Sequence, residues 1–442
     1  MMAQDPRTII AERPMSRLQI IAVAIAVGLN ALDGFDVLSI SFASPGIAKE
    51  WGVDRAALGV VLSMELIGMA VGSVVLGRVA DRIGRRLTVL GCLAVMCIGM
   101  AGATRAHGLT DLSLWRVLTG LGIGGMLAAV NALTAEYTNA RYRNLSLAIM
   151  VIGYPLGAVI GGSVAAVLLK SGDWRSVFEF GAVTTAIFIP LVWFFVPETV
   201  HYLAARRPAD AVARINHALR RMGHGMIDAL PAVTVRESKQ SAGDIFNPAL
   251  LRITLVLSIA YFAHAICFYF ILKWSPKIVV DMGYLPSAAA GVLVWANVGG
   301  ALGGAIFGFV SGRVGLKSLT LITLIGSAVA VAVFGSGANS TLVQLSALAF
   351  AGGLFTNSAI VGLYTIFARA FPTHVRASGT GFAIGIGRGG AALSPILAGW
   401  LFQSGFSLQY VGIAMGAGSL VAAALIATLK FNFEPDEQPE AA

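Results

Sequence analysis

Apolar residues along the chain gather in runs of about 20, the length that an α-helix needs to cross about 30 Å of hydrocarbon. In the first part of the chain these runs fall at 18–42, 56–80, 87–104, 112–135, 144–169 and 177–197. After a polar stretch they resume at 252–279, 286–311, 317–335, 341–368, 377–403 and 407–430. The pattern predicts an all-α polytopic membrane protein with twelve transmembrane helices in two six-helix halves.

Polar segments divide the chain into five expected parts. These are an N-terminal tail at 1–17, a six-helix bundle over 18–197, a linker loop over 198–251, a second bundle over 252–430 and a C-terminal tail at 431–442. Within the linker, "RRPADAVARINHALRRMGH" alternates apolar and basic residues at helical spacing. This favours an amphipathic helix on an anionic membrane surface, in a loop whose simplest role is a tether.

Composition agrees with the membrane assignment. The chain is 57% hydrophobic and 12% charged, with a net charge of +9, whereas soluble proteins carry about 25% charged residues. The basic residues lie in short connections between the apolar runs, which argues against a nucleic-acid partner. The three cysteines, Cys92, Cys97 and Cys267, fall inside apolar segments with neither disulfide nor metal spacing.

Lysine and arginine also predict the orientation of the chain. They concentrate in the connections that face the cytoplasm if the N-terminus is inside, for example at 78–86 and 206–221. By the positive-inside rule both termini are then cytoplasmic. We expect a multi-pass protein of the cell inner membrane.

The two halves share a sequence repeat. "GRVADRIGRR" (77–86) follows the second apolar run and "GFVSGRVGLK" (308–317) follows the eighth. The matched pairs are Gly77 with Gly308, Arg82 with Arg313, Gly84 with Gly315, and Arg86 with Lys317. Repeated halves of this kind are typical of secondary transporters.

The first apolar run carries two acids in "NALDGFDVLS" (30–39). A carboxylate at bilayer depth costs about 2.5–3.5 kcal/mol, so such residues usually have a function. At 1.5 Å per residue, Asp33 lies about 22 Å from the start of its helix, near the expected depth of Glu65 and Arg116. We therefore predict a proton-coupling cluster of Asp33, Asp36, Glu65 and Arg116. The alternatives are that the aspartates only pair with Arg116 and that Glu65 snorkels to the outer water.

The second half supplies candidates for binding an organic anion. Arg388 lies near mid-membrane and could hold a carboxylate, or could instead donate to backbone carbonyls of the seventh or eighth helix. Tyr261, His264 and Phe268 recur at helical spacing and could form an aromatic wall, although such stripes also serve packing. Lys273 is expected to snorkel from the outer end of its helix. Further cavity candidates are Asn30, Trp295, Asn297, Asn357 and Tyr364.

Three segments resemble motifs of the major facilitator superfamily. "GRVADRIGRR" is similar to its signature loop between helices two and three, "RVLTGLGIGG" (116–125) to its helix-four motif, and "PETVHYLAAR" (197–206) partly to the block after helix six. The resemblance implies a twelve-helix transporter. It also implies that the first loop is a conformational latch formed by Gly77, Asp81, Arg82, Gly84, Arg85 and Arg86.

The stretch "DGFD" (33–36) resembles the Asp-Gly-x-Asp signature of the aromatic acid:proton symporter branch. This implies proton-coupled import of a benzoate-, 4-hydroxybenzoate- or protocatechuate-type anion, with Asp33 and Asp36 needed for transport. We expect a monomer in the lipid bilayer, driven by the proton gradient without a cofactor.

Other functions stay open or are disfavoured. A symporter for another organic anion, such as sialic acid, nicotinate or lactate, remains an alternative, and a transporter-like sensor a remote one. An enzyme is not expected: "GLGIGG" lies inside an apolar run rather than after a strand, so it does not predict a dinucleotide site.

Overall fold

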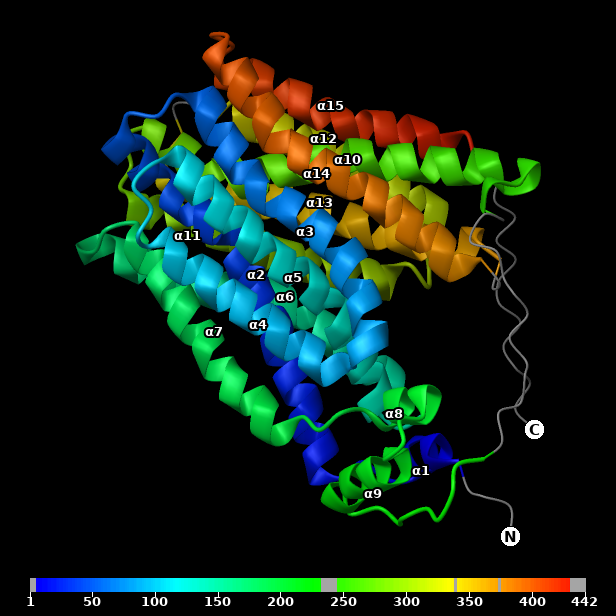
Figure 1. Cartoon of the computed structure of the whole chain (residues 1–442). Coiled ribbons are helices and arrows are strands. Elements are labelled where there is room, and N and C mark those ends of the chain that lie inside the picture. The colour runs from blue at the N-terminus through cyan, green and yellow to red at the C-terminus, as the bar shows by residue number, and fades with distance from the viewer. Residues whose placement is uncertain (1–4, 232–244, 338–339, 373–374, 430–442) are drawn as a thin grey trace.

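The computed structural model describes residues 5–231, 245–337, 340–372 and 375–429, which contain helices and no strand (Figure 1). Twelve helices are long and apolar enough to span a membrane, as predicted. The first half has α2 (Arg17–Trp51), α3 (Arg55–Ile83), α4 (Arg85–Ala103), α5 (Leu109–Tyr137), α6 (Arg143–Ser171) and α7 (Arg175–Phe195). The second has α10 (Pro248–Asp281), α11 (Pro286–Val310), α12 (Leu316–Gly335), α13 (Leu342–Ala370), α14 (Arg376–Gln403) and α15 (Leu408–Ala427).

Helix boundaries follow local capping chemistry as well as hydropathy. Ser16 and Gln19 form a reciprocal capping box at the start of α2. This helix continues past the predicted end at residue 42, through Pro45, and stops at Gly52, which has a φ of 61°. A helix does not have to end where its apolar run ends, and glycine provides the left-handed residue that terminates it.

The two halves repeat one packing arrangement. α3 packs on α5 as α11 packs on α13, and α2 packs on α6 as α10 packs on α14. Two matched positions of the sequence repeat behave alike: Arg86 donates to the Trp193 carbonyl in α7, and Lys317 to the Ala427 and Leu429 carbonyls at the end of α15. Both cations therefore bind carbonyls near a helix C-terminus, where positive charge is favourable.

Glycines bring helix backbones into direct contact within each half. Gly157 of α6 lies against the Ala31 carbonyl of α2, Gly120 of α5 against the Glu65 carbonyl of α3, and Gly353 of α13 against the Ala296 carbonyl of α11. A Cβ at any of these glycines would overlap the facing carbonyl oxygen. Small residues are what allow membrane helices to approach so closely.

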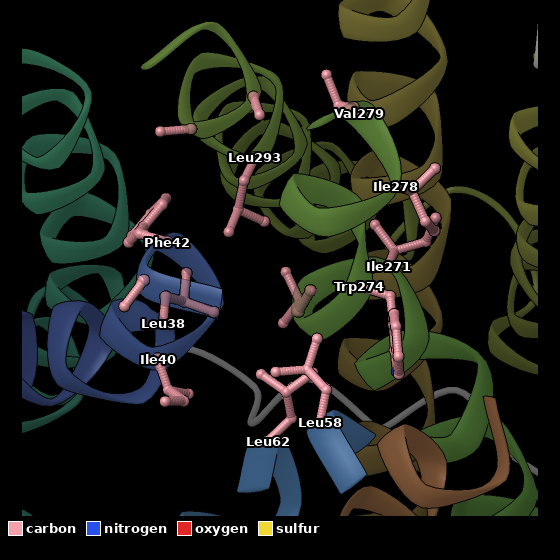
Figure 2. Packing of buried hydrophobic residues seen from close by; sticks show 14 of the residues in the cluster. Leu38, Ile40, Phe42, Leu58, Leu62, Ile271, Trp274, Ile278, Val279 and Leu293 are labelled. Carbon is pink, nitrogen blue, oxygen red and sulfur yellow. The ribbon is translucent and has the colours of Figure 1, made fainter. Parts of the chain in front are cut away.

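The halves meet mainly at one end of the bundle. We call the end that holds α1 (Pro6–Glu12) and the last residues of α15 the terminal end, and the opposite end the distal end. Figure 1 shows the two halves close together distally and farther apart toward the terminal end. α14 packs on α3 and α11 on α6 across this junction. Figure 2 shows the shared apolar core there, with Leu38, Phe42 and Leu62 facing Ile271, Trp274 and Leu293.

The linker and N-terminus form a small cap on the first half (Figure 1). It consists of α1, α8 (Val200–Arg206) and α9 (Ala211–Arg221). The predicted amphipathic helix is α9, but its buried residues Ile215 and Leu219 share a core cluster with Ile9 and Ile10 of α1. Its apolar face therefore packs on protein. The prediction that this face lies on a membrane surface is wrong.

Gly353→Ala should destabilise the protein because the added methyl group would push α13 away from α11. Overpacking of this kind costs about 1–3 kcal/mol. We expect a lower midpoint of thermal unfolding in detergent. The matched control is its neighbour Gly352→Ala, where the nearest atom to the new Cβ is 3.9 Å away, so its midpoint should be unchanged or slightly higher. Equal midpoints for the two variants would contradict the backbone-contact argument.

Candidate functional site

Among the side chains that the structure describes, five charged ones are buried in the membrane-spanning region. They are Asp33 and Asp36 of α2, Glu65 of α3, Arg116 of α5 and Lys273 of α10; Asp33 is 2% exposed and the other four are 0% exposed. Four of these residues were predicted to form a cluster. The fifth, Lys273, comes from the other half.

Glu65 is the centre of this cluster. One of its carboxylate oxygens lies 2.5 Å from an Arg116 guanidinium nitrogen, and the other lies 3.4 Å from the Lys273 ammonium. Arg116 also donates to the Asp36 backbone carbonyl at 3.0 Å and lies over the Phe178 ring. Glu65 thus binds two cations inside the protein, and the alternative that it snorkels to the outer water is wrong.

Lys273 does not snorkel either. Its ammonium points across the junction, donates to the Val37 carbonyl of α2 and contacts Glu65. The sequence placed it near the outer end of an apolar run, but α10 continues to Asp281, about two turns further. The side chain is therefore too deep to reach water, and it takes polar partners from the opposite half instead.

The carboxylates of Asp33 and Asp36 lack such partners. Both oxygens of Asp36 and one of Asp33 have no hydrogen-bond partner among the residues that the structure describes. The Asp36 carboxylate lies beside Gly181 of α7, where an added Cβ would be 3.3 Å from its Oδ1. Asp36 therefore points into the first half rather than at the junction, and Arg116 binds its backbone instead of its carboxylate.

Tyrosines and one arginine surround the junction on the terminal side of this cluster. The hydroxyls of Tyr261 (α10) and Tyr364 (α13) are 2.8 Å apart. Tyr154 of α6 and Tyr269 of α10 both pack against one apolar cluster that contains residues of both halves. Tyr154 and Tyr269 were not among the predicted site residues, although a tyrosine hydroxyl in an apolar run was the available signal.

Arg388 of α14 reaches across the junction. Its guanidinium donates to the Met69 carbonyl of α3 at 2.8 Å. This is the backbone bond expected as the alternative to anion binding, although the carbonyl belongs to the second span rather than to a helix of its own half. A guanidinium carries five N–H donors, so one such bond is compatible with a ligand on another edge.

Several predicted cavity residues bind backbone within their own half. His264 has Ser419 Oγ at 2.9 Å from one ring nitrogen and the Thr356 carbonyl at 2.9 Å from the other, so it does not face a cavity as expected. The amides of three asparagines donate to carbonyls: Asn30 to Met150, Asn297 to Leu293 and Asn357 to Gly300. A polar side chain inside a membrane bundle is satisfied by a nearby carbonyl, which explains the correction for His264. Each asparagine amide keeps its oxygen as an acceptor, so the cavity role of Asn30, Asn297 and Asn357 stays a prediction.

The aromatic candidates divide between core and surface. Phe268 is half-buried and its ring lies edge-on to that of Tyr269, with centroids 5.2 Å apart. Trp295 is 51% exposed, on one helical stripe of α11 with the exposed Leu302, Ile306 and Phe309. An exposed apolar stripe on a membrane span faces lipid, so the prediction of Trp295 as a cavity residue is wrong.

The predicted latch loop is anchored to the first half. Gly84 has a φ of 103°, and Arg85 forms an ion pair with Glu136 at 3.2 Å. Glu198 of the "PETV" block accepts bonds from the backbone N–H groups of Arg85 and Arg86 at the start of α4. Burial raises the pKa of Glu198 in spite of these bonds. The Arg82 carbonyl accepts a bond from Tyr202, Gly77 lies near Ala128, and the side chain of Asp81 lies outside the described residues.

Comparisons with known proteins agree with this architecture. The model of the Major Facilitator Superfamily matches residues 26–334 and 286–442. The gallate transporter of Pseudomonas putida is 29% identical over 428 residues, which cover 96% of this chain and 94% of the relative. The 4-hydroxybenzoate transporter PcaK of Pseudomonas putida is 30% identical, with 95% of this chain and 94% of the relative covered.

The fold also matches a solved transporter. The crystal structure of a D-xylose–proton symporter superposes with a TM-score of 0.72 at 17% identity, covering 92% of this chain and 97% of the symporter. The family model spans nearly the whole chain, and the helices have the repeat expected for that fold. The chain is a multi-pass transporter rather than an enzyme, and it belongs to the major facilitator superfamily.

Proposed function

We propose that the protein imports a small aromatic carboxylate together with protons by alternating access. The acid is of the benzoate, 4-hydroxybenzoate or protocatechuate type. The similar proteins named for gallate and 4-hydroxybenzoate support this class, because both compounds are hydroxylated benzoates. In this proposal the protein lies in the inner membrane, the terminal end faces the cytoplasm, and the distal end faces outward.

The observation that carries proton coupling is a pair of buried aspartates, of whose four carboxylate oxygens three have no hydrogen-bond partner among the described residues. An ionised carboxylate buried without a partner costs several kcal/mol, and the protonated acid avoids most of that cost. Both carboxylate oxygens of Asp36 and one of Asp33 are buried without a hydrogen-bond partner among the described residues, whereas both nearby cations bind Glu65. We therefore expect the carboxyl groups of Asp33 and Asp36 to be protonated in this arrangement.

Arg116 provides a route to release the protons. Its guanidinium already touches the Asp36 backbone carbonyl. A shift of this cation from Glu65 to the Asp36 carboxylate would favour the ionised aspartate. In the proposed cycle the aspartates take up protons from outside and release them to the cytoplasm when Arg116 changes partner.

The tyrosines at the junction suit an aromatic anion. Tyr154 and Tyr269 present rings that can stack on an aromatic substrate, and their hydroxyls can bind its ring substituents. Arg388 can hold a carboxylate. Because these residues come from α6, α10 and α14, a ligand among them would contact both halves and respond to their relative movement.

The latch loop fits the opposite arrangement of the halves. Here the halves are close at the distal end, and the contacts described for loop 77–86 are with α7, Glu136 and the segment after α7. We propose that the loop contacts the second half when the terminal end closes, and so stabilises the outward-facing arrangement.

Uptake measurements test the substrate class and the coupling. Proteoliposomes with an alkaline interior should accumulate labelled 4-hydroxybenzoate above the level of protein-free liposomes, because proton entry drives the anion inward. A protonophore should abolish the difference. Competition by benzoate, protocatechuate, nicotinate, lactate and sialic acid would rank the alternatives. Protein-dependent uptake that is insensitive to the protonophore would contradict proton coupling, and binding without uptake would favour a sensor.

Asp33→Asn and Asp36→Asn should separate coupling from binding. Each variant should lose gradient-driven accumulation, down to the protein-free level, yet keep exchange of labelled for unlabelled acid. The matched control is Asp54→Asn, an exposed N-cap residue of α3 that asparagine replaces well. The control should accumulate the acid like the native protein. Full accumulation by both aspartate variants would remove these residues from the mechanism.

A further inference from the structure

Lys273 is the only member of the buried charge cluster that belongs to the second half. Both polar partners of its ammonium lie across the junction: the Val37 carbonyl of α2 and the Glu65 carboxylate of α3. A lysine that is fully buried is normally stabilised by an opposite charge. Its counter-charge is therefore supplied by the other half of the protein.

Glu65 does not depend on Lys273 in the same way. Its other oxygen is bound by Arg116, at 2.5 Å against 3.4 Å for Lys273. Arg116 belongs to the same half, and Gly120 holds α5 directly against the Glu65 backbone. The Glu65–Arg116 pair should therefore move as one unit with the first half.

Opening of the distal end would therefore change the counter-charge of Lys273 but not that of Glu65. Movement of α10 away from α2 and α3 leaves Glu65 neutralised by Arg116, whereas Lys273 loses its counter-charge. Water would then reach the Lys273 ammonium, and this cation would attract anions from the distal side. An anion that replaces Glu65 at Lys273 would thus stabilise the open arrangement.

The surroundings of Lys273 define the anion. Tyr269 lies one helical turn away on the same face of α10, with a half-buried ring. Tyr154 of α6, from the opposite half, packs against the same apolar cluster as that tyrosine. An ammonium one turn from aromatic rings matches a carboxylate attached to an aromatic ring.

We infer that Lys273 binds the carboxylate of the transported acid when the distal end is open, and that Glu65 displaces this carboxylate when the end closes. The identity of the acid rests on the proposed function. Glu65 is then an internal competitor that returns the substrate to the cytoplasmic side. This differs from a structural latch, in which loss of either partner would have the same effect.

Ligand-induced thermal stabilisation of the purified protein tests this inference. The probes are 4-hydroxybenzoate, gallate, nicotinate and lactate, with 4-hydroxybenzamide as the uncharged analogue. For the acids that stabilise the native protein, Lys273→Gln should raise the half-maximal concentration about tenfold or more, the effect of losing a charged hydrogen bond. Glu65→Gln should lower that concentration or leave it unchanged. The amide should respond to neither substitution.

Two further variants keep the test decisive. Lys273→Arg should retain most of the stabilisation, because it preserves the positive charge. Lys277→Gln removes a lysine one turn away that pairs with Asp281, and it should bind like the native protein. If Glu65→Gln does not fold, the inference is tested by Lys273→Gln, Lys273→Arg and Lys277→Gln. Only Lys273→Gln should then raise the half-maximal concentration of the acid about tenfold or more.

The outcomes separate this inference from the proposed function. Equal stabilisation of the native protein and Lys273→Gln by an aromatic acid would overturn the inference and leave the function standing. Equal weakening in Lys273→Gln and Glu65→Gln would also overturn it, in favour of a latch. Stabilisation by lactate alone, lost in Lys273→Gln, would support the inference and contradict the aromatic substrate. Stabilisation by none of the acids would contradict both.

Discussion

One buried carboxylate, that of Glu65, binds a cation from each half of the protein. Arg116 approaches it from α5 and Lys273 from α10. Removing these charges from water is costly, so each of them needs a partner of opposite charge. Apolar side chains shared by the two halves exclude water at the distal end. Opening of the distal end would therefore break the apolar closure and the Glu65–Lys273 contact together, whereas the Glu65–Arg116 pair lies within the first half.

Backbone packing determines which part of this arrangement is rigid. Glycine contacts fix α3 against α5 and α2 against α6 within the first half, and α11 against α13 within the second. The Glu65–Arg116 pair lies inside a rigid half, whereas the Glu65–Lys273 contact crosses between halves. Arg116 also binds the Asp36 backbone carbonyl, so a change of partner by Arg116 would connect proton release to the junction. The tyrosines and Arg388 come from both halves, so a ligand bound among them would be affected by movement of one half relative to the other.

Sequence reasoning predicted the features that depend on position along the chain. The twelve spans of the described residues, the repeat and the burial of Asp33, Glu65 and Arg116 inside the bundle agree with what hydropathy and the sequence pattern predict. Features that depend on rotation about a helix axis were harder to predict. Asp36 points toward α7, Trp295 toward the outer surface, and His264 toward Ser419 and Thr356. Contacts between segments far apart in the sequence determine these side-chain directions. Such contacts produce no pattern in the local sequence from which the directions could be predicted. Lys273 was misjudged because its partners lie more than two hundred residues away in the sequence.

The central claim is that each transported acid moves with protons carried by Asp33 and Asp36. Its most direct test is a pH recording in weakly buffered proteoliposomes without an imposed gradient. Addition of 4-hydroxybenzoate should alkalinise the external medium, beyond the passive effect seen with protein-free liposomes, in proportion to labelled acid taken up. The double variant Asp33→Asn/Asp36→Asn should show only the passive effect. Protein-dependent uptake of the acid without alkalinisation would contradict the account.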